Sequence, residues 1–130
     1  MDEVYEFLKK AGTYYLATVD GDKARCRPFG TIDIFDGALY IQTGAVKDVS
    51  KQMKANPNVE ICACIGPEWI RLNGKAVLDE RIEAAQHMLD NYPMLAERYQ
   101  PGDGNCEVFR LEECTAKIES FVAEPKEFKF

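Results

Sequence analysis

Histidine is nearly absent from this chain, and its cysteines lack the spacing of a metal site. The single histidine, His87, cannot by itself form a multi-ligand metal site or a catalytic triad, so we expect a surface or packing residue. The five cysteines form an odd set without CxxC pairs, which predicts free thiols in a reducing compartment and no bound metal. On a strand, Cys62 and Cys64 point to one face, where we expect them to pack as small apolar side chains.

Positive charge and long apolar runs are also scarce. The 16 Lys and Arg residues against 22 Asp and Glu leave a net charge of −6, which disfavours nucleic acid as a partner. No stretch is long and apolar enough to span a membrane, and the first ten residues carry acids where a signal peptide carries bases. We therefore expect a cytoplasmic protein, with residues 1–130 forming one domain.

The first third of the chain reads as a helix followed by strands. Residues 2–11 carry apolar side chains at helical spacing, with Gly12 as the stop. TYYLATV predicts a strand, residues 20–21 a hairpin turn, and KARCRPFGTIDIF one long second strand. A turn at residues 36–37 leads to ALYIQT. The short turns predict a three-stranded antiparallel meander.

The remaining two thirds mix helices with strands. A helical period follows residues 43–44 and ends at Asn56-Pro57, and the strands NVEICACI and WIRLNGKAVLD come next. Residues 80–99 predict a second long helix that Pro93 breaks or redirects. Its expected N-cap is Asp79, and its expected buried stripe is Ile82, Ala85, Met88 and Leu89.

The chain closes with CEVFRLEE and TAKIESFVA, which read as two strands before a charged tail. With these, seven strand-like runs surround the inserted helices. This pattern predicts a mainly β fold with inserted helices (α+β), an antiparallel small barrel rather than an alternating α/β sheet.

One candidate anion site lies in YIQTGAVKDVSKQ, where a strand leads into the start of a helix. Free backbone N–H groups and the helix dipole make such a junction receptive to a phosphate. Lys47 and Lys51 lie four residues apart on one helix face. On this stretch alone, a solvated helix face is the simpler interpretation, and GAVKD lacks the second glycine and the GK[ST] ending of a P-loop.

A second candidate is KARCRPFG, in which strand alternation gives Lys23, Arg25 and Arg27 a common face. Like charges in a row favour a bound anion. Pro28 cannot donate to a strand ladder, so it marks an edge, a bulge or a place where a ligand lies alongside. A charge-protected edge strand explains the same pattern equally well.

Trp69, the single tryptophan, opens a predicted strand and shares a face with Arg71. A core anchor is the commoner role of a lone tryptophan, and a wall for an aromatic ligand is the alternative. The surrounding residues do not decide between these two roles.

Together, LATVDGDKARCRPFG, LYIQTGAVKDVSKQMKANPNVEICA and WIRLNGKAV resemble the pyridoxamine 5′-phosphate oxidase-like family of FMN-binding split β-barrels. The resemblance implies a homodimer with one FMN in each of two clefts at the subunit interface. It implies a cofactor site made of Arg25, Arg27, Pro28, Phe29, Gln42, Thr43, Lys47, Lys51 and Trp69. Trp69, with Arg71, is expected to approach from the partner subunit.

The same resemblance implies an FMN-dependent oxidoreductase whose substrate the sequence does not identify; the candidate reactions are reduction of a flavin, a quinone or a nitro compound with NAD(P)H. Because a flavin carries the electron chemistry itself, no catalytic acid or base is required, and we assign none. The tail VAEPKEFKF has no arginine or histidine, unlike the substrate-binding segment of the oxidases themselves. The alternatives are a non-catalytic flavin-binding or sensing module and, further away, a haem- or deazaflavin-binding split barrel.

Overall fold

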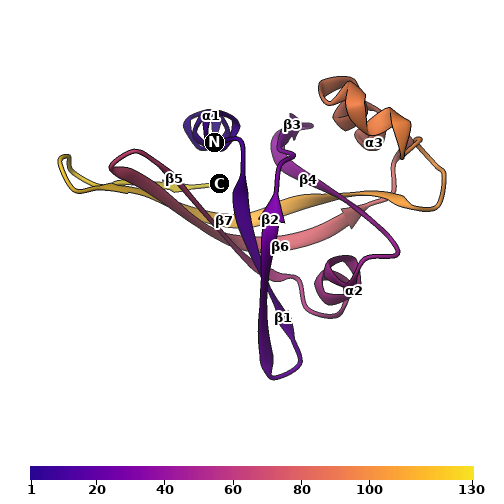
Figure 1. Ribbon diagram of the computed structural model, residues 1–130, viewed down its shortest axis with the longest axis horizontal. Coiled ribbons are helices and arrows are strands. Elements are labelled where there is room, and N and C mark those ends of the chain that lie inside the picture. Colours follow the sequence, from indigo (N-terminus) through magenta and orange to yellow (C-terminus); the bar gives the residue numbers. More distant parts are fainter.

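The computed structural model describes all 130 residues, and one eight-stranded sheet forms most of it (Figure 1). The helices are α1 (Asp2–Ala11), α2 (Asp48–Ala55) and α3 (Ile82–Asn91), with a short 3-10 helix at Pro93–Glu97. The strands are β1 (Tyr14–Asp20), β2 (Lys23–Phe29), β3 (Asp33–Phe35), β4 (Ala38–Gly44), β5 (Asn58–Ile65), β6 (Glu68–Asp79), β7 (Cys106–Ser120) and β8 (Lys126–Lys129).

The sheet order is β2-β1-β5-β6-β7-β4-β3, with β8 added beside β7, and every pair is antiparallel. The end strands β2 and β3 form no ladder with each other. This arrangement confirms the mainly antiparallel β class with inserted helices. None of the helices is long and apolar enough to cross a membrane.

The opening helix follows its sequence signals closely. In α1, Val4, Phe7 and Leu8 are buried on one face. Gly12 ends the helix with a φ of 78°, a conformation that glycine adopts without strain, and its N–H donates to the carbonyl of Leu8 (3.1 Å).

The predicted long second strand and the meander are wrong. The chain forms two separate hairpins, β1–β2 and β3–β4, and β4 pairs with β7 instead of β2. Side chains interrupt the strand at residues 30–32. Tyr14 donates to the carbonyl of Thr31, and the Tyr92 hydroxyl bonds both the N–H and the carbonyl of Ile32 (3.0 and 3.1 Å). Because these backbone groups already have partners, they do not join a ladder.

The two predicted closing strands are one bent strand, β7. The bend falls at Glu113, whose φ is 50°, opposite Gly74 of β6. A Cβ on Gly74 would lie only 3.0 Å from the Cys114 sulfur, so glycine allows the two strands to approach here. The charged tail is an eighth strand, β8. Beyond its end, the backbone groups of Phe130 and Cys114 bond each other (3.0 and 2.7 Å).

The predicted break of the helix over residues 80–99 at Pro93 is confirmed: α3 covers Ile82–Asn91, and a 3-10 helix follows at Pro93–Glu97. α3 ends at Asn91 because a residue before proline disfavours helical backbone, here Tyr92 before Pro93. The N-cap is Arg81, whereas Asp79 is the last residue of β6 and accepts the Arg81 N–H (3.0 Å). Ala85, Met88 and Leu89 are buried as predicted, but Ile82 is 54% exposed because it lies in the first turn, outside the cluster that buries α3.

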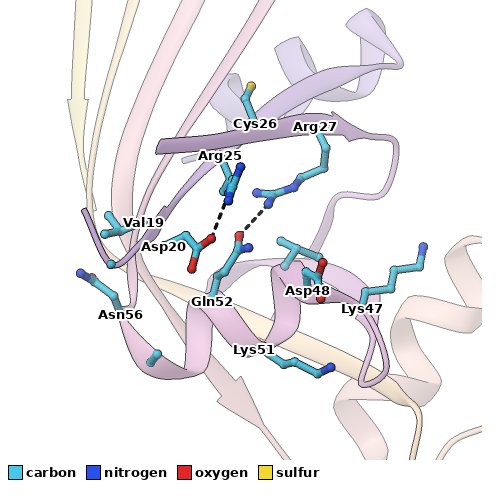
Figure 2. A pocket seen from close by; sticks show the side chains of 13 residues that line it. Val19, Asp20, Arg25, Cys26, Arg27, Lys47, Asp48, Lys51, Gln52 and Asn56 are labelled. Atoms are coloured by element: carbon cyan, nitrogen blue, oxygen red, sulfur yellow. Dashed lines mark hydrogen bonds and ion pairs between the residues drawn. The ribbon is translucent and has the colours of Figure 1, made fainter. Parts of the chain in front are cut away.

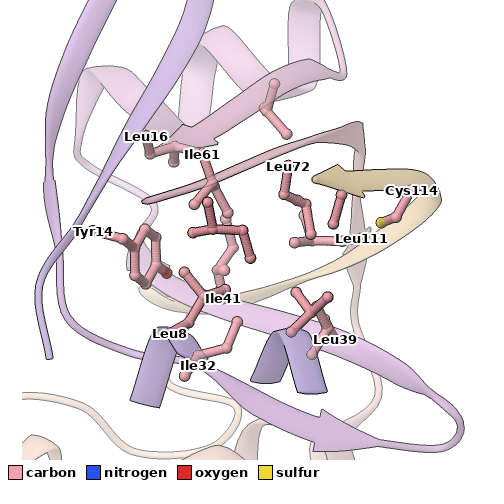
Figure 3. Close-up of a cluster of buried hydrophobic side chains, with 14 of the residues drawn as sticks. Leu8, Tyr14, Leu16, Ile32, Leu39, Ile41, Ile61, Leu72, Leu111 and Cys114 are labelled. Carbon is pink, nitrogen blue, oxygen red and sulfur yellow. The ribbon is translucent and has the colours of Figure 1, made fainter. Parts of the chain in front are cut away.

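The core consists of two clusters. The larger has 21 buried residues and lies where α1 and α2 pack against the sheet; Leu8, Leu16 and Ile61 are among the side chains drawn in Figure 3. The smaller has six residues and joins α3 to β4 and β7. α2 lies beside the β1–β2 hairpin, and α3 lies by the β3–β4 hairpin (Figure 1).

All five cysteines are unpaired. Cys62 and Cys64 share a strand face as predicted, but both are exposed, so the expectation that they pack as small apolar side chains is wrong for this chain. Cys114 is the one buried thiol, and burial raises its pKa to about 11. No group of His, Cys, Asp and Glu side chains has the arrangement of a metal site.

His87 has a specific partner. Its Nδ1 lies 2.6 Å from Oδ2 of Asp33, whose side chain is only 4% exposed. The other oxygen of Asp33 accepts from the Ile34 N–H (2.9 Å) and from the side-chain amide of Asn91 (3.1 Å). A buried carboxylate therefore ties α3 to β3.

We expect Asp33→Ala to lower the free energy of unfolding by about 2–3 kcal/mol, because hydrogen bonds to a buried charged group are lost together. The measurement is urea denaturation followed by circular dichroism. Asp90→Ala removes an exposed carboxylate of α3 and is the control, which should stay within about 0.5 kcal/mol of the parent. Equal effects of the two changes would contradict the anchoring role of Asp33.

Candidate functional site

A groove of about 1030 Å³ separates the β1–β2 hairpin from α2 (Figure 2). Its lining includes four basic residues, Arg25, Arg27, Lys47 and Lys51, and two acidic ones, Asp20 and Asp48. The groove thus carries excess positive charge in a chain whose net charge is −6. Charge of this sign in a concave site favours an anionic ligand.

The charge of Arg25 is largely offset within the chain. Its Nε donates to Asp20 across the tip of the hairpin (2.9 Å), and both side chains are more than 40% exposed. Exposed pairs of this kind are screened by water and contribute little. Arg25 is nevertheless the one cation of the four that has a carboxylate partner.

Arg27, in contrast, has only uncharged acceptors. Its Nη1 donates to the carbonyl of Leu16 (3.2 Å) and to Thr18 Oγ1 (2.7 Å), and its Nη2 donates to Gln52 Oε1 (2.7 Å). No carboxylate forms an ion pair with it. Burial lowers the pKa of Arg27 because desolvation disfavours the cation, yet a guanidinium stays charged at neutral pH.

Lys47 and Lys51 lie at the start of α2. Lys47 is the N-cap, with extended backbone, and Lys51 follows one turn later. No backbone carbonyl accepts from the N–H groups of Asp48 or Val49, and neither lysine forms an ion pair. Two free backbone donors, the helix dipole and two cations thus meet at one end of the groove.

A single carboxylate, that of Glu107 on β7, anchors α2. One of its oxygens accepts from the Ser50 hydroxyl, which is fully buried, and the other accepts from Lys54 Nζ (2.6 Å). Glu107 is also paired in register with Thr43 of β4. The helix that borders the groove is therefore tied to the neighbouring strand pair.

A smaller pocket of about 170 Å³ adjoins the groove, and Lys47 lines both. Its lining includes Pro28, Phe29, Gln42 and Thr43, together with Gly30, Thr31 and Tyr99. Gln42 and Thr43 are buried, and the Gln42 side-chain amide donates to the Thr43 carbonyl (3.0 Å). Apart from Lys47, this lining is uncharged.

Eight of the nine predicted cofactor residues thus line these two connected spaces, and Trp69 does not. The Trp69 indole N–H donates to Glu119 (2.9 Å), and its ring lies 5.0 Å from that of Phe121. Arg71 forms an ion pair with Glu60 (2.9 Å). Neither residue lines the groove of its own chain.

Three further residues were not predicted from the sequence: Thr18 and Gln52, which bond Arg27, and Tyr99, which lines the smaller pocket. The hairpin turn lies at residues 21–22, one residue later than the predicted turn at residues 20–21, and this register pairs Thr18 with Arg25 and Leu16 with Arg27. Gln52 follows Lys51 directly, but its role depends on how α2 packs against the hairpin, which no local pattern encodes. Tyr99 packs against Gly44, with its hydroxyl 3.1 Å from where a Cβ would be.

Comparisons with known proteins identify a family for this chain and several structures that resemble it. A family model described as pyridoxamine 5′-phosphate oxidase matches residues 1–113. A NimC/NimA family protein of Clostridium acetobutylicum is 38% identical, with a TM-score of 0.97 over 100% of this chain and 92% of that chain. No curated protein matches the sequence.

Two more distant structures show the same fold. General Stress Protein 26 of Bacillus anthracis has a TM-score of 0.76 at 20% identity, covering 98% of this chain and 97% of that one. A pyridoxamine 5′-phosphate oxidase-related, FMN-binding protein of Nostoc punctiforme has a TM-score of 0.65 at 17% identity, covering 98% and 92%. At these identities the likeness extends to the fold alone.

We expect Glu107→Ala to loosen α2, because the buried Ser50 hydroxyl loses its acceptor, at a cost of about 1–3 kcal/mol. Hydrogen exchange should accelerate at the amides of α2 beyond the change in β5 and β6. Glu112→Ala removes an exposed carboxylate of the same strand and is the control. Uniform acceleration across all strands would show that Glu107 has no local role.

Proposed function

The chain belongs to the pyridoxamine 5′-phosphate oxidase family, and on this premise we propose that it binds FMN and acts as an FMN-dependent oxidoreductase. One observation carries the proposal: a cationic groove lies beside a smaller pocket, Lys47 lines both, and the other residues that line the smaller pocket are uncharged. FMN has a phosphate at one end of its ribityl chain and a planar ring at the other. It therefore requires an anion site next to a mostly uncharged one.

The residues fit the two ends of FMN. Arg27, Lys47 and Lys51 would hold the phosphate, since none has a counter-ion in the chain, with Arg25 as a weaker member of the site. Pro28, Phe29, Gln42 and Thr43 would line the flavin ring. The name of the Nostoc punctiforme protein, which includes FMN binding, supports this choice of cofactor.

Bound FMN would supply the electron transfer, and the protein would bind it, orient it and exclude water. Gln42 and Thr43 suit an orienting role because both are buried and bonded to each other. The lining of the two spaces includes no histidine.

We extend the proposal to a homodimer in which the partner subunit's Trp69 covers the flavin site. Support comes from the position of Trp69 away from its own groove and from the apolar residues next to it. Phe121, whose ring lies beside that of Trp69, is 84% exposed, and its neighbour Val122 is 81% exposed, so a second subunit could cover them. A homodimer also suits a cleft that one chain leaves incomplete.

We further propose that residues 1–130 act as one cytoplasmic domain, consistent with five unpaired cysteines. Haem is the weaker alternative, because His87 is held by Asp33 and lines neither the groove nor the smaller pocket. A deazaflavin would bind at the same site. A protein that binds the flavin without turnover would also use this site.

We expect Arg27→Ala to weaken FMN binding by roughly 2–4 kcal/mol, because a charged donor to a partly buried anion is lost. Riboflavin, which lacks the phosphate, should lose much less. Lys47→Ala and Lys51→Ala should have smaller effects, because lysines near solvent act as screened charges, and added salt should weaken FMN binding. Flavin fluorescence titration measures each affinity.

The control for Arg27→Ala is Lys23→Ala, which removes an exposed cation of the same strand that does not line the groove. It should leave FMN affinity unchanged. Equal losses of FMN and riboflavin affinity on Arg27→Ala would mean that Arg27 supports the ring or the fold rather than the phosphate.

We expect NAD(P)H-dependent reduction of a flavin, a quinone or a nitroaromatic, and no useful oxidation of pyridoxamine or pyridoxine phosphate. A phosphorylated substrate needs a second cationic pocket, but residues 106–130 carry more acids than bases. The rate of NAD(P)H absorbance loss tests the first expectation, and an assay of pyridoxal phosphate formation tests the second. A pyridoxal phosphate kcat of order 1 s⁻¹ or above would refute it, and no NAD(P)H consumption with any acceptor would favour the module without turnover.

A further inference from the structure

Arg27, Thr18 and Gln52 form a closed ring of hydrogen bonds, and two of its members, Arg27 and Gln52, line the groove. Arg27 Nη1 donates to Thr18 Oγ1 (2.7 Å), Thr18 Oγ1 donates to Gln52 Oε1 (2.6 Å), and Arg27 Nη2 donates to the same oxygen (2.7 Å). Thr18 is only 3% exposed. The three side chains come from β1, β2 and α2, so the ring joins the hairpin to the helix across the groove. Figure 2 shows the bond between Arg27 and Gln52.

The ring determines which way the Gln52 amide points. Two donors converge on Oε1, so turning the amide over would set its NH2 group against a guanidinium and a hydroxyl that has already accepted a bond. The nitrogen, Nε2, therefore points away from Arg27. It donates to no group of the chain, and Gln52 lines the groove.

The ring also leaves the charge of Arg27 intact. Other arginines of this protein face carboxylates: Arg25 pairs with Asp20, and Arg71 pairs with Glu60. Arg27 is held by three neutral oxygens, and two of its five N–H groups remain free. A carboxylate at position 52 would accept the same two hydrogen bonds but would cancel this charge.

We propose that Gln52 is a determinant of anion specificity in the groove: its carbonyl oxygen orients Arg27 without neutralising it, and its amide NH2 donates to the ligand phosphate. This inference rests on the proposed FMN function and adds a residue to it. The amide acts at the phosphate end of the ligand alone, so it separates phosphorylated from unphosphorylated flavins.

The test is Gln52→Glu, which preserves shape and the two accepted bonds. FMN affinity should fall about 100-fold, since a carboxylate replaces a donor beside a phosphate, whereas riboflavin affinity should change by less than about threefold. Gln86→Glu adds the same charge on an exposed face of α3 and is the matched control, with FMN affinity expected to be unchanged. Gln52→Met removes the amide without adding charge and should give a smaller selective loss.

The side-chain NH2 signals of Gln52 provide a second measurement. Their loss in Gln52→Met assigns them in a ¹⁵N–¹H spectrum of the intact protein. They should shift when FMN or inorganic phosphate is added and stay in place with riboflavin.

The outcomes separate this inference from the proposal beneath it. If the parent protein binds neither FMN nor riboflavin, the proposed function and this inference both fail. If it binds both, but Gln52→Glu leaves the ratio of their affinities unchanged or the NH2 signals respond equally to both flavins, Gln52 has no role in selecting the phosphate. The proposed function would then stand without it.

Discussion

A half-buried arginine without a counter-ion, Arg27, is the constraint around which the groove is organised. Removing a cation from water is costly unless it gains partners, and here the partners are three neutral oxygens that hold the guanidinium without cancelling it. The β1–β2 hairpin supplies two of these oxygens and α2 supplies the third. Since Glu107 in turn fixes α2 to β7, the positive charge is held between elements that come from distant parts of the chain.

Local sequence signals were sufficient to predict the elements whose ends depend on neighbouring residues. The helix stop at Gly12, the β1–β2 hairpin and the end of α2 before Pro57 all follow from glycine, turn and proline chemistry. The meander failed because the partner of β4 is β7, far along the chain, and turn lengths carry no information about such pairing. The prediction of one continuous strand past Phe29 failed for the same reason, since the hydroxyl that interrupts the strand belongs to Tyr92.

The residues of the candidate site also fall into those that local patterns predicted and those that depend on distant contacts. Strand alternation and helix spacing were enough to single out Arg27, Lys47 and Lys51, because charges on one face are visible in the sequence. Gln52 could not be identified from the sequence, because a glutamine beside a lysine resembles any solvated helix position. Its role arises only when α2 packs against the hairpin and its carbonyl meets Arg27. Trp69 is a third case, since its predicted role depends on a second subunit.

The central claim is that this chain binds FMN in a cleft that two subunits complete. Sedimentation velocity of the purified protein with added FMN, recorded at the visible absorbance of the flavin, tests both parts at once. The account predicts that the flavin sediments with a species of twice the 14.7 kDa chain mass. Flavin that sediments as a free small molecule, or with a single chain, would contradict it.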